Sequence, residues 1–333
     1  MSQDLPVVAI GAMGGTIAMK PAESAGPVTP GLDAHDLVAT APGLVDVADL
    51  VVESICNIPS PSITVNEVLQ AFDYAKGAVA DGATGVVLTH GTDNLEETAY
   101  LLDLWWDEDA PLVVTGAMRS AMMAGADGPA NLLAATVTAA APGARGLGVV
   151  ACLADAVHLA RWVSKTSSMG MDAFESPGRG PVGRLVEGRF HRMWSSAGPR
   201  PAALSLPGAG PIEVALLEMA FGDDGRLIPL AGRAGLRGVV VAGAGVGHVS
   251  AAAADAVSEA IGAGMTVVVA SRTHSGGTAN NSYGYAGSEV DLIDRGAIMA
   301  GDLSPRKARL LLHVMLKAGY SPALMRQRFA IHS

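Results

Sequence analysis

The stretch VVLTHGTDNLEETAYLLD, residues 86–103, decides the fold that we predict for this chain. Its apolar start indicates a buried strand, and a polar turn follows. Asp93 and Glu96 have the D-x-x-E spacing of a capping box, which predicts the start of a helix. In open α/β sheets, ligands bind just past the carboxyl ends of strands, where helix N-terminal N–H groups also favour anions. Thr92 and Asp93 are therefore candidate site residues. The alternative is that Thr92 is only a turn residue and Asp93 only a helix cap.

Composition limits the class of protein. The 333 residues suffice for about two domains, half of them are hydrophobic, and only 4% are aromatic. The net charge is −10 and no basic run occurs, which argues against a nucleic-acid partner. No apolar run reaches the ~18 residues that a spanning helix needs, so we expect no membrane partner. The start, MSQDLPVVAI, has no signal-peptide pattern, and we expect a cytoplasmic protein.

Candidate site residues follow several other predicted strands. Thr16 lies in the glycine-rich segment GAMGGTIA, Ser60 in a polar turn, and Ala117 after the strand VVT. Strands that alternate with helices of roughly 10–15 residues indicate βαβ units and a mainly parallel sheet. We expect strands at residues 6–10, 47–55, 86–88, 112–115 and 148–152, with helices at 33–40, 65–79 and 128–140. The strand ends of such a sheet open on one edge, so these residues should converge there with Thr92 and Asp93. The alternative interpretation of Thr16, considered alone, is that it is an ordinary residue in a strand-to-loop turn.

The alternation lapses between residues 156 and 192, and a stretch rich in proline and glycine follows at 195–211. We predict an N-terminal α/β domain at 1–195, a linker at 196–211 and a smaller C-terminal α/β domain at 212–333. The larger domain should hold a mainly parallel sheet flanked by helices. Lys165 lies where the alternation lapses. It is a solvated surface residue unless it lies next to Asp93.

Several kinds of site are excluded by spacing. The segment GAGVGH lacks the third glycine and the later acidic residue of a dinucleotide loop, and GAMGGTIA lacks the P-loop lysine. The eight histidines have no metal-binding spacing, so we expect neither a metal nor a cofactor. Cys56 and Cys152 accompany apolar runs and are expected to be core residues, not a disulfide. His90 either orients the turn around Thr92 or is a hydrogen-bonded core histidine.

These segments resemble the bacterial-type L-asparaginases. GGTIA at residues 14–18 and THGTDNLEETAYLLDL at 89–104 resemble the two signature segments of that family. The resemblance continues in order through VTGAMR, ADGPANLL, SKTSS, AGAGVGHVS and EVDLIDRGAIMAGDLSPRKAR, over essentially the whole chain. It implies two α/β domains, a homotetramer of intimate dimers with sites at the dimer interface, and hydrolysis of the side-chain amide of L-asparagine.

The resemblance also implies catalytic roles. Thr16 corresponds to the nucleophile that attacks the amide. Thr92, Asp93 and Lys165 correspond to a second catalytic group. A threonine hydroxyl needs a proton acceptor or a strong local field, and Lys165 beside Asp93, with its pKa lowered by burial, is suited to supply one.

The substrate-binding residues follow from the same resemblance. Ser60, Thr92 and Asp93 match positions that hold the α-carboxylate and α-amine, and backbone N–H groups near Thr92 and Ala117 match the oxyanion hole. Glu289 matches a residue that reaches the substrate's ammonium group from a neighbouring subunit. His248 stands where the family usually has an asparagine near that amine.

One further departure concerns the lid. The family usually has a lid tyrosine against the nucleophilic threonine, whereas this chain has no tyrosine between Thr16 and Tyr74. We hypothesise that Tyr283 or Tyr285 replaces that phenol from the partner subunit. The alternatives for function are a glutaminase-asparaginase, an enzyme active on D-asparagine, and a non-catalytic amino-acid-binding relative. The glycine spacing excludes a dinucleotide-dependent oxidoreductase.

Overall fold

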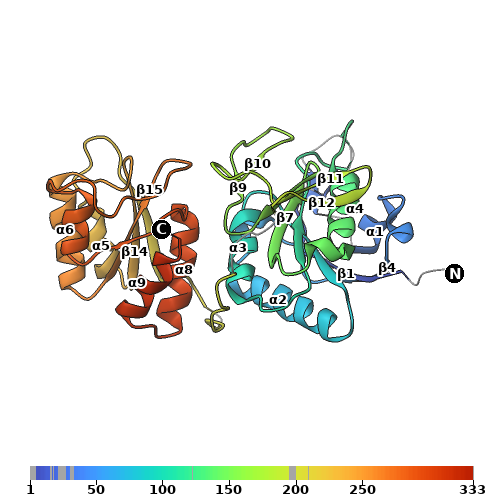
Figure 1. Cartoon of the computed structure of the whole chain (residues 1–333), viewed down its shortest axis with the longest axis horizontal. Coiled ribbons are helices and arrows are strands. Elements are labelled where there is room, and N and C mark those ends of the chain that lie inside the picture. The colour runs from blue at the N-terminus through green and yellow to red at the C-terminus, as the bar shows by residue number, and fades with distance from the viewer. Residues whose placement is uncertain are drawn as a thin grey trace. The chain divides into compact units, whose positions relative to one another are not determined.

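The structure is a computed structural model, which describes residues 5–15, 17, 19–21, 28–30, 34–121, 123–194, 200–208 and 210–332. Thr16, the predicted nucleophile, and part of the predicted linker lie outside the described residues. The chain forms two compact units, Met1–Ala203 and Leu204–Ser333 (Figure 1). The division between Ala203 and Leu204 lies within residues 196–211.

The first unit is built on an eight-stranded sheet in the order β12-β11-β8-β7-β6-β5-β1-β4. Its parallel strands are β1 (Val7–Ala12), β4 (Asp49–Ser54), β5 (Gly85–Thr89), β6 (Leu112–Thr115) and β7 (Val149–Leu153). Three antiparallel strands extend it, namely β8 (Ala156–Leu159), β11 (Gly183–Val186) and β12 (Arg189–Arg192). The predicted mainly parallel sheet is confirmed, and the lapse in alternation corresponds to these antiparallel strands.

Two short antiparallel pairs lie outside the large sheet. One consists of β2 (Met19–Pro21) and β3 (Val28–Pro30), and the other of β9 (Ser164–Lys165) and β10 (Phe174–Glu175). The second pair carries Lys165, whose backbone is therefore held by a strand and not by an open loop.

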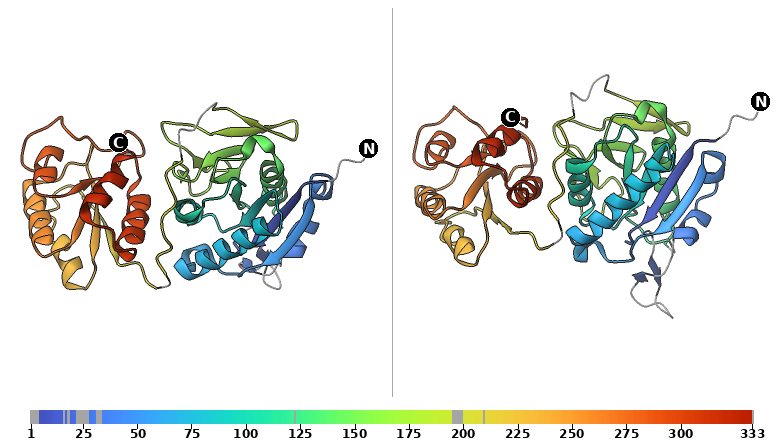
Figure 2. Two further views of the ribbon diagram at one scale, coloured as in Figure 1. Left: turned by 60° about the horizontal axis from the view of Figure 1, so that its bottom comes forward. Right: turned by 90° about the horizontal axis from the view of Figure 1, so that it is seen from below.

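Helices cover both faces of the large sheet, as Figure 2 shows. They are α1 (Ala34–Ala39), α2 (Val65–Ala80), α3 (Leu95–Trp105) and α4 (Gly128–Ala140). Val8 and Ile10 of β1 pack in one core cluster with residues of α1 and α4. Gly11 instead faces the ring of Tyr74 in α2, because successive strand residues point to opposite faces. The central strands are buried on both sides, which explains why they are apolar runs without alternation.

Two helix starts test the capping predictions. α2 begins with the T-x-x-E box that its sequence predicts: Thr64 is the N-cap, and the side chains of Thr64 and Glu67 each accept a backbone N–H. The D-x-x-E prediction for α3 is wrong, because Asn94 holds the N-cap position and no side chain caps it. The carboxylates of Asp93 and Glu96 are instead bound by a residue far away in the chain.

The sequence predicts Asp127 as the N-cap of α4, with Pro129 in the first turn of the helix. Asp127 holds the N-cap position and a proline follows in the first turn, but the Asp127 side chain makes no cap bond. Its carboxylate accepts the N–H groups of Met118 and Arg119, both at 2.9 Å. Asp127 thus holds the turn after β6, next to Ala117.

The second unit holds a four-stranded parallel sheet, β13 (Val214–Glu218), β14 (Gly238–Gly243), β15 (Thr266–Ser271) and β16 (Ile298–Met299). Its helices are α5 (Leu227–Arg233), α6 (Ala251–Gly262), α7 (Glu289–Asp294), α8 (Pro305–Lys317) and α9 (Pro322–Ala330). The smaller α/β fold predicted for this part is confirmed. Within the described residues, no helix is both long and apolar enough to cross a membrane.

Candidate active site

The turns after β1, β5 and β6 interlock at the carboxyl edge of the large sheet. The Met13 N–H donates to the Thr89 carbonyl at 3.0 Å, and the His90 N–H donates to the Thr115 carbonyl at 2.8 Å. A Cβ atom on Gly15 would lie 2.4 Å from the Gly91 Cα, and Gly15 has a φ of +92°. Glycine is required at that position for both reasons. The β1 turn therefore lies directly against the β5 turn.

Ser60 and Ala117 lie around the same point. Ser60 begins a short 3₁₀ turn, is buried, and has its hydroxyl 2.6 Å from where a Cβ on Gly91 would stand. A Cβ on Gly116 would lie 2.5 Å from the His90 carbonyl oxygen, and Ala117 beside it is buried. The structure thus gathers the turns that carry Ser60, Thr92 and Ala117. The position of Thr16 lies outside the part that the structure describes.

Lys165 reaches the β5 turn. Its Nζ donates to the Thr92 hydroxyl at 3.0 Å and to the Asp93 carboxylate at 2.7 Å. The Lys165 side chain is 14% exposed, whereas that of Asp93 is 61% exposed. The alternative of a solvated surface lysine is therefore wrong. Asp93 does not cap α3, and its carboxylate and the Thr92 hydroxyl both bind the Lys165 amine.

Glu96 is a site residue that sequence reasoning missed. It lies buried in the first turn of α3, and its Oε2 accepts the backbone N–H of Lys165 at 2.6 Å. The D-x-x-E spacing had singled it out, but for a capping role. Through this bond, Glu96 holds the Lys165 backbone, while Asp93 holds the Lys165 amine.

His90 is fully buried in the β5 turn, and its Nδ1 lies 2.7 Å from the Gly91 carbonyl. Burial lowers its pKa to about 4, although the bond to Gly91 opposes this shift. The histidine is therefore neutral at pH 7, and Nδ1 carries the proton because a carbonyl can only accept. Its Nε2 has no hydrogen-bond partner among the described residues. His90 is both a core histidine and a support of the turn that carries Thr92.

The second unit carries the two other predicted site residues, which contact each other. The His248 Nε2 lies 2.9 Å from the Glu289 Oε2. Glu289 is fully buried at the start of α7, and its Oε1 accepts the N–H groups of Ser282 and Tyr283. Burial raises the pKa of Glu289, but these hydrogen bonds outweigh it and bring the pKa to about 2. Glu289 is therefore an ionised, firmly held carboxylate.

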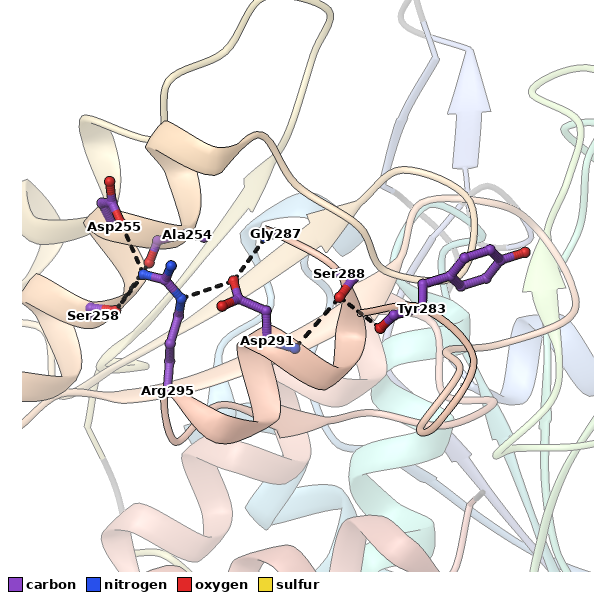
Figure 3. Close-up of polar contacts among 8 residues, drawn as sticks. All are labelled: Ala254, Asp255, Ser258, Tyr283, Gly287, Ser288, Asp291 and Arg295. Atoms are coloured by element: carbon purple, nitrogen blue, oxygen red, sulfur yellow. Dashed lines mark hydrogen bonds and ion pairs between the residues drawn. The ribbon is translucent and has the colours of Figure 1, made fainter. Parts of the chain in front are cut away.

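Figure 3 shows how the start of α7 is braced. Arg295 donates from Nε to Asp291 at 2.8 Å, and from Nη1 to Asp255 and Ser258 of α6 at 2.9 Å each. The same oxygen of Asp291, Oδ2, also accepts the Gly287 N–H at 2.8 Å. This network ties α7 to α6 and fixes the turn immediately before Glu289.

The prediction of a core cysteine is confirmed for Cys152 and not for Cys56. Both cysteines are free, Cys152 is buried, and Cys56 is half-buried. Burial raises the pKa of the Cys152 thiol to about 12, which makes it unreactive. Within the part of the chain that is described, no three His, Cys, Asp or Glu residues gather in a way that would hold a metal ion.

A hydroxyl, a lysine and a carboxylate in contact at the carboxyl edge of an α/β sheet are the parts of a hydrolase that activates a hydroxyl group. Comparisons with known proteins identify the family. Residues 7–197 match the family model described as Asparaginase, N-terminal, and residues 213–329 match that of the Glutaminase/Asparaginase C-terminal domain. The chain belongs to the asparaginase family.

Individual relatives match over nearly the full length. L-asparaginase 2 of Bacillus subtilis (strain 168) is 32% identical, over 98% of this chain and 87% of the relative. The glutaminase-asparaginase of Pseudomonas aeruginosa is 34% identical, over 97% of this chain and 90% of the relative. The crystal structure of the "Probable Cytoplasmic L-asparaginase" of Campylobacter jejuni has a TM-score of 0.85 at 34% identity, and the match covers 98% of this chain and 99% of that one.

Proposed function

We propose that the chain is an L-asparaginase, which hydrolyses the side-chain amide of L-asparagine to L-aspartate and ammonia through a threonine nucleophile. One observation carries the proposal: Lys165 contacts both Thr92 and Asp93 at the sheet edge where the strand-end turns meet. Membership of the asparaginase family supports the choice of an amide as substrate.

The reaction needs a base, because a threonine hydroxyl is a weak nucleophile at neutral pH. In its neutral form, the Lys165 amine is placed to take a proton from the Thr92 hydroxyl at 3.0 Å. By resemblance, Thr16 is the nucleophile: its hydroxyl proton passes to the Thr92–Lys165 group as its oxygen bonds to the amide carbon. The C–N bond then breaks, and the leaving nitrogen takes that proton and departs as ammonia. Water hydrolyses the resulting ester, which releases L-aspartate and restores the Thr16 hydroxyl. Thr92, Lys165 and Asp93 form the group that takes up and returns these protons.

Substrate binding is assigned to the same edge. Ser60, Thr92 and Asp93 are proposed to hold the α-carboxylate and α-amine of the substrate. Backbone N–H groups near Thr92 and Ala117 are proposed as the oxyanion hole, where each donor is typically worth ~3–4 kcal/mol. Glu289, with His248 beside it, is proposed to approach the substrate's ammonium from a neighbouring subunit.

The proposal includes a homotetramer of intimate dimers, because the resemblance to the family implies active sites at a dimer interface. Light scattering on the purified protein tests the mass of the assembly. It also includes a cytoplasmic location, supported by the name of the C. jejuni neighbour. Cell fractionation of the native host tests that location.

Substrate preference has a second candidate. Relatives named L-asparaginase and glutaminase-asparaginase match at similar identity, 32% and 34%. One methylene usually supports only ~1–3 kcal/mol of discrimination, so activity on L-glutamine is the alternative to a strict asparaginase. An enzyme active on D-asparagine is tested alongside it.

The test is ammonia release by the purified protein from L-asparagine, L-glutamine and D-asparagine, with Thr16→Ala as the control. We expect release from L-asparagine that disappears in the variant, while L-aspartate still binds. Release that survives in Thr16→Ala would remove the nucleophile assignment. Aspartate binding without release from any amide would instead identify a non-catalytic amino-acid-binding relative.

A further inference from the structure

Tyr285, His248 and Glu289 form a continuous row of hydrogen bonds in the second unit. The Tyr285 hydroxyl lies 2.6 Å from the His248 Nδ1, and the His248 Nε2 lies 2.9 Å from the Glu289 Oε2. The three side chains thus connect an exposed tyrosine, 53% of which is accessible, with a glutamate that is fully buried.

The donors in this row have only one arrangement while the imidazole is neutral. Glu289 is ionised at pH 7 because its pKa lies at about 2, and a carboxylate can only accept hydrogen bonds. His248 must therefore carry its proton on Nε2. The Nδ1 is then an acceptor, and the Tyr285 hydroxyl is the group that donates to it.

The backbone around the row is fixed from both sides. His248 closes a tight turn after β14, in which its N–H and carbonyl both bond to Ala244 at 2.8 Å. On the other side, the Ser288 hydroxyl donates to the Tyr283 carbonyl at 2.7 Å (Figure 3), and the Val249 N–H donates to the Gly287 carbonyl at 2.9 Å. With the backbone held in this way, the remaining freedom of the His248 ring is rotation of its side chain, and Tyr285 restrains that rotation.

Tyr283 offers an internal comparison. Its ring meets His248 edge-on at 4.9 Å between centroids, close to the 5.3 Å of Tyr285. Its exposure, 49%, is also similar. The hydroxyl of Tyr283, however, makes no hydrogen bond to the residues that the structure describes. The two tyrosines therefore differ in their hydroxyl groups, because only that of Tyr285 bonds to His248 among the described residues.

We propose that Tyr285 is a positioning residue for the substrate's ammonium group. It holds His248 so that Nε2–H stays on Glu289, and it thereby fixes the carboxylate that faces the ammonium. This inference rests on the proposed function. It also changes the hypothesis of a replaced lid phenol: the Tyr285 hydroxyl has a partner within its own unit, which leaves Tyr283 as the candidate for that task.

The test compares Tyr285→Phe with the wild type on L-asparagine and on succinamate, which has the same amide and carboxylate but no α-amine. We expect KM for L-asparagine to rise about threefold to tenfold, the usual range for one lost hydrogen bond, while kcat changes less than twofold. The kinetic constants for succinamate should stay within twofold. Tyr283→Phe should affect both substrates to the same extent.

A double-mutant cycle separates positioning from a general structural role. In a His248→Ala background, Tyr285→Phe should have no additional effect on KM, because no imidazole is left to hold. Equal effects of Tyr285→Phe on both substrates, or additive effects in the cycle, would overturn the inference. If the wild type releases ammonia but Tyr285→Phe is indistinguishable from it, the inference fails and the proposed function stands. If the wild type releases none, the proposed function itself fails.

Discussion

The Lys165 amine lies 3.0 Å from the Thr92 hydroxyl, although 73 residues separate them in the chain. The antiparallel pair β9–β10 makes this contact possible, because it pairs Lys165 with the buried Phe174. This pairing fixes the position of the Lys165 backbone, from which the side chain extends. Asp93 then binds the amine from its exposed side at 2.7 Å. A lysine held by a strand, a carboxylate and a hydroxyl is oriented before any substrate arrives, which is what proton transfer from a threonine hydroxyl to a base requires.

The first prediction concerns this amine. Lys165→Met keeps most of the side-chain volume and removes the base, so kcat for L-asparagine should fall by about 10²–10⁴, the usual contribution of a positioned acid–base group. The far-ultraviolet circular dichroism spectrum should not change. Lys76→Met is the matched control, because Lys76 pairs with Asp107 and Glu108 at the surface and should leave kcat within twofold. Retained turnover in Lys165→Met would exclude Lys165 as the proton acceptor.

The second prediction concerns Glu96, which holds the Lys165 backbone. Glu96→Leu removes the acceptor of a partly buried N–H and should lower the free energy of unfolding by about 1–3 kcal/mol. It should also lower kcat at least tenfold, because the Lys165 strand is no longer tied to α3. Glu96→Gln keeps an oxygen for the same N–H and should be clearly milder in both measurements. Equal losses in the two variants would show that charge, and not the hydrogen bond, is what the site needs.

The third prediction concerns the contact between the β1 and β5 turns. Gly15→Ala and Gly43→Ala both place a Cβ at a φ of about +90°, which costs ~1–2 kcal/mol by itself. Gly43 faces open space, whereas the new Cβ on Gly15 would meet the Gly91 backbone. Gly15→Ala should therefore lower Tm further than Gly43→Ala.

Turnover gives the sharper comparison for these two glycines. Moving the β1 turn away from Gly91 displaces groups that act together on the substrate, so kcat/KM should fall at least tenfold in Gly15→Ala. Gly43→Ala should stay within twofold of the wild type. Similar kcat/KM values in both variants would mean that the close approach of Gly15 and Gly91 is not needed for the site.

Strands and local caps were predictable because their signals are local. β6 has the predicted bounds, residues 112–115, since it is an apolar run between turn residues. The box of Thr64 and Glu67 formed because both partners lie within one helical turn and no other group competes for them. The convergence of the strand-end turns followed from the parallel order of the strands.

The same pattern failed at Asp93 and Glu96 because a distant residue competes for both carboxylates. Lys165 is 72 residues from Asp93 and 69 from Glu96, so no spacing rule contains it. A tertiary contact to an ammonium group and to a buried N–H outweighs a local cap. The burial of Glu289 was equally unpredictable, because its hydrogen-bond donors come from a turn whose shape depends on the Arg295 network.

The last prediction concerns the pH dependence of stability. The folded pKa of Glu289, about 2, lies below the ordinary value of 4.5, so its ionised form is the one that folding favours. The stabilisation should be complete above about pH 5 and should be lost as the pH falls from 4.5 towards 2. The Glu289→Gln variant has no carboxyl group to titrate at this position. Its side-chain NH₂ group would face the backbone N–H groups that donate to the carboxylate in the wild type. The Tm difference between the wild type and Glu289→Gln should therefore be largest above pH 5 and should narrow as the pH falls from 4.5 towards 2.

The control variant is Glu259→Gln, which removes a surface ion pair with Arg233 and should shift Tm little at any pH. A Glu289→Gln difference that stays constant from pH 6 to pH 2.5 would show that the carboxylate is not held in its ionised form.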